Sequence, residues 1–393
     1  MVEWKTISSL GDYFGGLTGK SKKDFENGNA KFITYMNVFA NPSLDTSTVG
    51  MVHINEGEKQ NKVQKGDILF SGSSETPDEA GMSCVVTDDL EGDFYMNSFC
   101  FGLRLHSPEQ FNLHYLKHML RSYSVRKAIS KTASGVTRFN ISKARFGKVL
   151  IPVPSLSEQN RIVSILDTFT ASIDNLKQQI EQRKKQYEHY RDQLLNFEGK
   201  DGILWPTIKE LFNTRNGYTP STKNDDFWID GTIPWFKMED IRENGHILND
   251  SNLHITPSAI KGKGLFKANS IILATSATIG EHALITVEHL SNQRFTNLYP
   301  NRTYENKVNM KFVYYYMYLI DEWCKSHTHQ GGFASVDMEG LYKLNFPIPS
   351  MSEQNRIVAI LDKFEDSISN LEQQLEQRQK QYEYYRNKLL TFE

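Results

Sequence analysis

Apolar residues recur in alternating steps of four and three over two long stretches of the chain. The first series comprises Ile162, Leu166, Phe169, Ile173, Leu176, Ile180, Arg183, Tyr187, Tyr190, Leu194 and Phe197. The second comprises Ile357, Leu361, Phe364, Ile368, Leu371, Leu375, Arg378, Tyr382, Tyr385, Leu389 and Phe392. This spacing is the heptad seam of a coiled coil, interrupted by the two arginines, which either fix the register or reach to the rim of the seam.

Each series begins at a helix start signal. Ser155 precedes Glu158 by three residues and Ser350 precedes Glu353 in the same way, a spacing that predicts two capping boxes. A helix over residues 158–198 is about 60 Å long at 1.5 Å per residue. Such a helix needs a partner, and the simplest one is its own copy, packed antiparallel within the chain; a coiled coil between two chains is the alternative.

The two helical stretches are copies of one another. Residues 152–198 return as residues 347–393 with no gap, and 33 of the 47 aligned positions are identical. The segments before them match only faintly, through pairs such as Trp4 with Trp205 and Ile7 with Ile208. The repeat is either purely structural, or its constant parts serve one shared partner twice while its variable parts serve two different targets. The unequal divergence favours the second interpretation.

The chain therefore divides into variable residues 1–150, constant residues 151–198, variable residues 199–346 and constant residues 347–393. Each variable block mixes short β-like runs, 67–71 and 270–274, with helical stretches near 113–126 and 312–323. The predicted fold class is α+β, with two mixed domains separated by two long helices in an antiparallel intramolecular coiled coil with pseudo-two-fold symmetry. The residues assigned to the coiled coil and to partner binding are Glu158, Gln159, Ile162, Leu166, Phe169, Ile173, Leu176, Glu353, Gln354, Ile357, Leu361, Phe364, Ile368 and Leu371.

Composition narrows the function classes. The 393 residues carry a formal net charge of −2, so a nucleic-acid surface has to be local. Three cysteines, none in CxxC spacing, suggest neither a disulfide framework nor a zinc site. The N-terminus lacks the pattern of a signal peptide and no apolar run is long enough to span a bilayer, which together predict a cytoplasmic protein.

A local basic stretch provides the candidate nucleic-acid contacts. Residues 117–148 contain nine Lys or Arg and no Asp or Glu, around a glycine-containing loop at 134–140. Such a loop suits phosphate and base-edge contacts, although a merely solvated surface is the alternative. The second half offers a lysine loop at 261–267 and a glycine-rich segment at 327–333. The candidate DNA-binding residues are Lys20, Lys22, Ser134, Thr137, Arg138, Asn140, Lys143, Arg145, Lys261, Lys263, Gln330 and Gly331.

No catalytic motif is recognisable. The segment Gly15–Ser21 resembles a phosphate-binding loop, but the required first glycine is replaced by Phe14. The sequence contains no GxGxxG and no Asn-Pro-Pro-aromatic signature of an amino-methyltransferase. The pair His327 and His329 lacks nearby cysteines for a metal site. We therefore predict neither catalytic residues nor a metal or cofactor of its own.

Two diverged blocks alternating with near-identical helices that open with Pro-x-Pro-Ser-x-Ser-Glu-Gln resemble the specificity subunit, HsdS, of type I restriction-modification systems. The resemblance implies two target-recognition domains that each read one half of a bipartite double-stranded DNA site, with the helices setting the spacer. It further implies two methyltransferase subunits that use S-adenosylmethionine, and restriction subunits that use ATP. The alternatives are a coiled-coil interaction scaffold without DNA readout and an enzyme with an unrecognised nuclease site.

Overall fold

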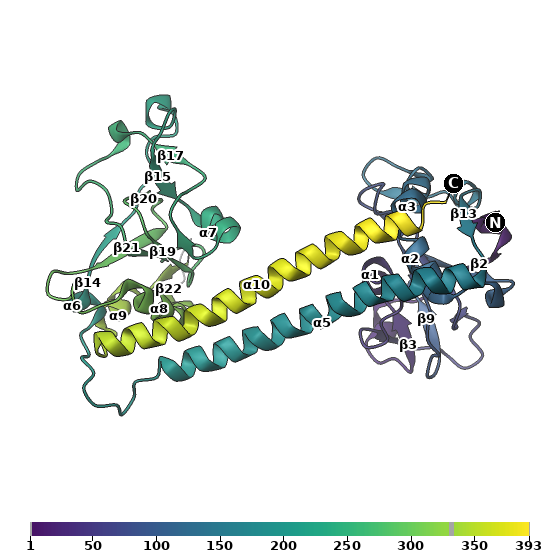
Figure 1. Ribbon diagram of the computed structural model, residues 1–393, viewed down its shortest axis with the longest axis horizontal. Helices are drawn as coiled ribbons and strands as arrows, with labels where there is room; N and C mark the ends of the chain where they lie inside the picture. The colour runs from purple at the N-terminus through teal and green to yellow at the C-terminus, as the bar shows by residue number, and fades with distance from the viewer. Residues whose placement is uncertain (1, 330–333, 393) are drawn as a thin grey trace. The chain divides into compact units, whose positions relative to one another are not determined.

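The computed structural model describes residues 2–329 and 334–392. The chain forms two compact units, and each is described by itself. Unit 1 holds residues 1–178 and 372–393, and unit 2 holds residues 179–371. Each unit contains a globular α+β part together with a portion of both long helices (Figure 1).

Unit 1 is built on two four-stranded sheets. The first has the antiparallel order β2 (Gly11–Gly15), β10 (Cys100–Leu105), β6 (Ile68–Ser71), β8 (Ser83–Val85). The second has the order β4 (Gly50–Val52), β3 (Ala30–Ile33), β9 (Phe94–Met96), β5 (Lys62–Val63). A small sheet joins β11 (Ala133–Ser134), β12 (Phe139–Ile141) and β7 (Ser73–Ser74), and β1 (Glu3–Thr6) pairs with β13 (Leu150–Val153). The helices are α1 (Tyr35–Ala40), α2 (Leu113–Met119), α3 (Tyr123–Ser130) and α4 (Lys143–Phe146), with short 3₁₀ turns at Ile7–Ser9, Lys22–Phe25 and Pro108–Gln110.

The unit 1 core forms where α2 and the first long helix cover the first sheet. Phe70, Phe101 and Phe146 pack ring against ring, with centroids 4.9–5.4 Å apart. Tyr115 of α2 and Ile162 of the long helix are fully buried in the same cluster. The strand expected at 67–71 is the wholly buried β6, whereas the helix expected at 113–126 is divided into α2 and α3.

Unit 2 repeats the plan with one larger sheet. Its order is β14 (Phe212–Asn216), β21 (Phe295–Pro300), β18 (Ser270–Ala274), β19 (His282–Ile285), β16 (Ile247–Leu248). Smaller sheets join β17 (His254–Ile255), β15 (Ile233–Phe236) and β20 (Leu290–Ser291), and β22 (Thr328–His329) with β23 (Ser335–Val336). The helices are α6 (Ile208–Leu211), α7 (Met238–Asn244), α8 (Met310–Ser326) and α9 (Met338–Lys343), with 3₁₀ turns at Asp225–Phe227 and Pro257–Ala259. The expected strand at 270–274 is β18, and the expected helix at 312–323 lies within α8.

The long helices are α5 (Leu156–Leu194) and α10 (Met351–Leu389), and they run antiparallel. In unit 1 the Phe169 ring of α5 stacks on the Tyr385 ring of α10, with centroids 5.2 Å apart. In unit 2 the Tyr190 ring of α5 stacks on the Phe364 ring of α10, with centroids 5.5 Å apart. An early residue of each helix therefore meets a late residue of the other, as Figure 1 also shows for the neighbouring ribbons within each unit. The pairing within one chain confirms the predicted antiparallel coiled coil.

The seam positions are buried only in part. Ile162 and Leu166 are fully buried in the unit 1 core, and Ile357 and Leu361 in the unit 2 core, whereas Tyr190 and Tyr385 are 44% and 39% exposed. Both helix ends also differ from the prediction. The predicted capping boxes are only half formed: the Glu158 N–H donates to Ser155 Oγ at 3.4 Å, but the Glu158 carboxylate binds Arg161 at 2.7 Å. The last seam position also lies beyond the helix, because α5 ends at Leu194 and the buried Phe197 packs into the unit 2 core.

Candidate nucleic-acid interface

The glycine-containing loop of unit 1 is the turn of a β-hairpin. Strands β11 and β12 pair through Ser134 and Asn140, and Asn140 pairs on its other side with Ser73 of β7. Gly135 has φ +153°, and a Cβ there would collide with the Arg138 carbonyl oxygen. The tip is open to solvent, since Val136 is 91% exposed. The predicted residues Ser134, Thr137, Arg138 and Asn140 therefore come together on one exposed hairpin.

Two cations of this region each lie over an aromatic ring near the start of β10. Arg138 Nε donates to Ser73 Oγ at 3.1 Å, and its guanidinium lies 5.3 Å from the Phe99 ring centroid. Lys143 Nζ lies 5.3 Å from the Phe101 ring centroid. Phe99 is an exposed residue of the turn before β10, whereas Phe101 lies within β10 and is buried. Arg138 and Lys143 are both exposed beside this end of β10, and Arg145 follows, exposed, on α4.

The nine basic residues of the stretch 117–148 do not form one continuous surface, which corrects the sequence interpretation. Arg121 donates to four backbone carbonyls, those of Val38, Phe39, Asn41 and Ser83, at 2.6–3.2 Å. Arg126 donates to the carbonyls of Asp78, Ala80 and Gly81 at 2.5–2.8 Å. Burial lowers the pKa of each of these two guanidinium groups to about 10, and both stay charged at neutral pH. These arginines satisfy main-chain oxygens inside unit 1 instead of facing a ligand.

Three further lysines of unit 1 differ in their surroundings. Lys117 is buried and its ammonium lies 3.0 Å from the Asp167 carboxylate of α5. Lys20 is largely buried as well, with its ammonium 2.6 Å from Glu58. Lys22 is exposed. Of the two lysines predicted near the Gly15–Ser21 loop, only Lys22 has its side chain in solvent.

In unit 2 the strands that flank residues 330–333 occupy the equivalent position. Strands β22 and β23 pair through His329 and Ser335, and Ser335 forms a bridge with Ser276, as Asn140 does with Ser73 in unit 1. The predicted contacts Gln330 and Gly331 lie outside the described residues. Lys261 and Lys263 are exposed on a separate loop, where the Lys261 N–H donates to the Tyr218 hydroxyl at 2.8 Å.

Arg294 is a candidate that the sequence interpretation missed. It is exposed at the start of β21, and its carbonyl accepts from the Thr275 N–H at 2.9 Å, next to the bridge at Ser276. Its N–H donates to Asn292 Oδ1 at 2.9 Å, just as the Phe99 N–H donates to Asn97 Oδ1 at 2.8 Å. Arg294 thus occupies the place of Phe99, and the 195-residue offset of the repeat would have identified it.

The glutamines that open the long helices have an internal role. Gln159 is fully buried; its Oε1 accepts from the Asn112 N–H at 2.8 Å, and its Nε2 donates to the Gln110 and Pro154 carbonyls. Gln354 makes the same bonds in unit 2, to the Asn309 N–H and to the Lys307 and Pro349 carbonyls. The prediction grouped both glutamines with the coiled-coil and partner-binding residues. In the structure their side-chain amides form hydrogen bonds within their own unit. Glu158 and Glu353 remain partly exposed, each bound to an arginine one turn later.

A family model described as the type I restriction modification DNA specificity domain matches residues 1–184 and 205–379. The chain belongs to this family. Among curated members, it is 48% identical over 201 residues to the EcoprrI specificity subunit of Escherichia coli, an alignment that covers 48% of this chain and 50% of that protein. It is 37% identical over 264 residues to the EcoR124I/EcoR124II specificity subunit of E. coli, covering 62% of this chain and 63% of that protein. The aligned regions therefore span about half and just under two thirds of these two family members.

Solved structures share the fold. One solved structure comes from work on complex assembly and conformational transition of the type I R-M system. The match covers 99% of this chain and 97% of that chain, with a TM-score of 0.66 and 16% identity. The type I S subunit from M. genitalium matches 100% of this chain and 97% of that chain, with a TM-score of 0.53 and 17% identity. At such low identity the likeness speaks for the fold of the family alone.

Two features are absent from the described residues, 2–329 and 334–392. No group of three or more His, Cys, Asp or Glu side chains is arranged to hold a metal ion there. No helix in the same residues has the length and apolar character needed to cross a membrane. The three cysteines, Cys84, Cys100 and Cys324, are buried free thiols whose pKa burial raises to about 12.

Proposed function

We propose that this chain is the DNA-specificity subunit of a type I restriction-modification complex. Its target-recognition domains, residues 1–150 and 199–346, each read one half of a bipartite double-stranded DNA site. The long helices set the spacer between the half-sites and bind the methyltransferase subunits. The observation that carries this proposal is the match of the specificity-domain family to both halves of the chain.

The contrast between the two hairpin regions supports two different half-sites. Both regions have the same backbone plan, in which a hairpin pairs with the segment that follows a buried central strand. Their side chains differ, because Arg294 stands where unit 1 has Phe99. Base-edge readout depends on the donors and acceptors that a surface presents, so surfaces of different chemistry select different bases.

We propose that the chemistry belongs to partner subunits. Two methyltransferase subunits would transfer the methyl group of S-adenosylmethionine to DNA, and restriction subunits would cleave with ATP. The sequence supports this division, because it contains neither a dinucleotide-type glycine motif nor a complete phosphate-binding loop nor the Asn-Pro-Pro-aromatic signature. The chain itself is proposed to supply no catalytic group, cofactor or metal.

The test is methylome sequencing of the native host with and without the gene for this chain. We expect one bipartite methylated sequence to disappear on deletion and to return on complementation. The purified chain, free of other subunits, should transfer no methyl group to the same DNA. Methylation that persists unchanged in the deletion strain would contradict the proposal.

A further inference from the structure

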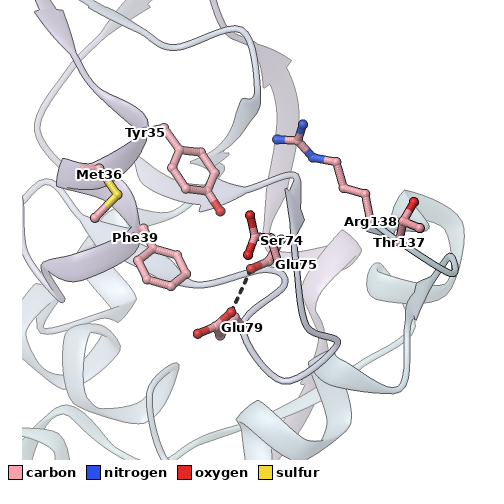
Figure 2. A pocket seen from close by; sticks show the side chains of 8 residues that line it. All are labelled: Tyr35, Met36, Phe39, Ser74, Glu75, Glu79, Thr137 and Arg138. Carbon is pink, nitrogen blue, oxygen red and sulfur yellow. Dashed lines mark hydrogen bonds between the residues drawn. The ribbon is translucent and has the colours of Figure 1, made fainter. Parts of the chain in front are cut away.

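A pocket in unit 1 lies between α1 and the tip of the β11–β12 hairpin. It has a volume of about 380 Å³, within the range of roughly 300–1,000 Å³ that is usual for ligand pockets. Figure 2 shows the α1 side chains on one side, Thr137 and Arg138 on the other, and Ser74 and Glu75 between them. The lining residues are Tyr35, Met36, Phe39, Ser74, Glu75, Glu79, Thr137 and Arg138.

Strand β7 ties the walls of the pocket together. The Ser73 hydroxyl accepts from Arg138 Nε at 3.1 Å, and the Ser73 carbonyl accepts from the Tyr35 hydroxyl at 2.7 Å. The Ser74 hydroxyl donates to the Glu79 carboxylate at 3.1 Å, and the Thr76 hydroxyl donates to the same carboxylate oxygen at 2.9 Å. The arginine, the aromatic ring and one carboxylate are therefore fixed by two adjacent serines.

The half-buried Arg121 and Arg126 brace two of the segments that line the pocket. Arg121 binds the Val38 and Phe39 carbonyls in the last turn of α1, where a cation also complements the helix dipole. Arg126 binds the Asp78 and Ala80 carbonyls on either side of Glu79. Because α1 and the segment around Glu79 are both braced, this part of the pocket is preorganised, and a ligand need not order it on binding.

The chemistry of the pocket suits a base edge with an amino group. Ionised carboxylates only accept hydrogen bonds, so Glu75 and Glu79 repel phosphate and call for a donor. In the major groove of DNA the base donors are the cytosine N4 and adenine N6 amino groups. The Tyr35 and Phe39 rings, stacked with centroids 5.7 Å apart, and Met36, 60% exposed, provide apolar surface beside these acceptors. Arg138 at the rim supplies the cation for the neighbouring phosphate.

We propose that this pocket reads a base bearing an exocyclic amino group, cytosine or adenine, in the half-site of the first target-recognition domain. Glu75 and Glu79 accept hydrogen bonds from the amino group, and Arg138 contacts the adjoining backbone. This inference rests on the proposed function and adds the base class that one domain selects.

The test compares the assembled methyltransferase complex carrying the wild-type chain, Glu75→Gln or Glu79→Gln. Each substitution keeps the shape of the side chain and replaces one acceptor oxygen with a donor. Selection from a library of duplexes, together with methylome sequencing, reports the base preference at every position. We expect one position of the first half-site to lose its preference for an amino-bearing base, with binding to the original site weakened roughly 5- to 100-fold. The second half-site is an internal control and should be unchanged.

A matched control is Glu26→Gln, an exposed carboxylate of the same unit that does not line the pocket. Glu75 is exposed, so its substitution tests the proposal even if Glu79→Gln unfolds. Duplexes in which adenine is replaced by purine, or cytosine by a pyrimidine lacking the amino group, identify which base is read. If both variants keep the wild-type sequence preference and affinity, the pocket does not read a base, while the proposed function still stands. A wild-type complex without any bipartite preference would reject both.

Discussion

The Phe169 ring contacts two groups of α10, the Tyr385 ring stacked on it at 5.2 Å and the Arg378 guanidinium at 5.7 Å from its centroid. Unit 2 repeats this arrangement around Phe364, with Tyr190 at 5.5 Å and Arg183 at 6.0 Å. Each seam arginine is thus paired with a phenylalanine of the opposite helix by a cation–π contact. In unit 1 the phenylalanine comes from α5 and the tyrosine and arginine come from α10; in unit 2 the roles are reversed. The same register of α5 against α10 therefore holds in both units.

Insertion of one heptad into both helices, after Gln179 and Gln374, should lengthen the recognised spacer. Seven residues keep the seam in phase and add about 10 Å of helix. At roughly 3.4 Å per base pair, the spacer should grow by up to about three base pairs while both half-site sequences stay the same. The methylated sequence of a host that carries the variant measures the change. Insertion of four residues into one helix alone should break the register and abolish assembly; an active double insertion with the original spacer would refute the role of the helices.

Replacing Gln159 with leucine should destabilise unit 1 by roughly 2–4 kcal/mol. The substitution removes the partner of the Asn112 N–H and of the Gln110 and Pro154 carbonyls at a site where Gln159 itself is fully buried. Hydrogen exchange of the α2 amides measures the loss, and Gln354→Leu should act equally in unit 2. Gln178→Leu, at an exposed position of α5, is the matched control. Equal stability of Gln159→Leu and the control would mean that the buried amide contributes nothing.

Arg121→Ala should unfold unit 1 more readily than Arg145→Ala does. Removal of Arg121 leaves four carbonyl groups without a donor, at a cost of roughly 2–5 kcal/mol. Arg145 is exposed, and its loss should change the free energy of unfolding by less than about 0.5 kcal/mol. Thermal unfolding of both variants makes the comparison. Similar midpoints would show that the Arg121 hydrogen bonds do not stabilise the domain.

Arg138→Ala and Lys143→Ala should weaken DNA binding and flatten its dependence on salt. Each lost phosphate contact lowers the slope of log affinity against log salt concentration by about one unit. Fluorescence anisotropy of the assembled complex at several salt concentrations provides the slope. Lys185→Ala, on α5 outside the target-recognition domains, should leave it unchanged. If Arg138 reads a base instead, specificity at one position relaxes; unaltered slopes for both variants would exclude this face as the DNA contact.

His289 should make unit 2 less stable in mild acid. Burial lowers its pKa from the ordinary value of about 6.5 to about 4, and its Nδ1–H donates to the Val287 carbonyl at 2.9 Å. The unfolded chain therefore takes up a proton that the folded unit resists. Stability is complete above pH 6.5 and falls by up to about 3 kcal/mol as the pH drops toward 4. Hydrogen exchange at the β21 amides should show this slope in the wild type and a shallower one in His289→Gln; identical slopes would place the pH dependence elsewhere.

The long helices were predictable because the heptad pattern is a local signal and occurs in both copies of the repeat. The heptad positions from Ile162 to Leu194 lie on α5, and their copies lie on α10. Strand β18 was predictable for a similar reason, since a short continuous apolar run between polar residues is typical of a buried strand.

The pocket and its braces were not predictable from local sequence. Tyr35, Glu79 and Arg138 are far apart along the chain, and only the tertiary fold brings them to one cavity. Arg121 and Arg138 look alike in a basic stretch, yet the first satisfies carbonyl oxygens inside the domain while the second reaches the surface. The sequence shows which residues are charged but not which groups they bind. For this reason the sequence alone assigns the half-buried arginines to the basic surface.

Gln159 attaches the start of α5 to the globular part of unit 1, and this attachment affects how such a protein can evolve. On the domain side, the Gln159 side-chain amide binds two main-chain groups, the Asn112 N–H and the Gln110 carbonyl. Every amino acid except proline has both a main-chain N–H and a main-chain carbonyl. Mutations that alter base selection can accumulate across the rest of the domain without disturbing this attachment. Under the proposed function, recombination at this attachment would exchange one whole target-recognition domain for another and so change the DNA specificity, while the long helices stay unchanged.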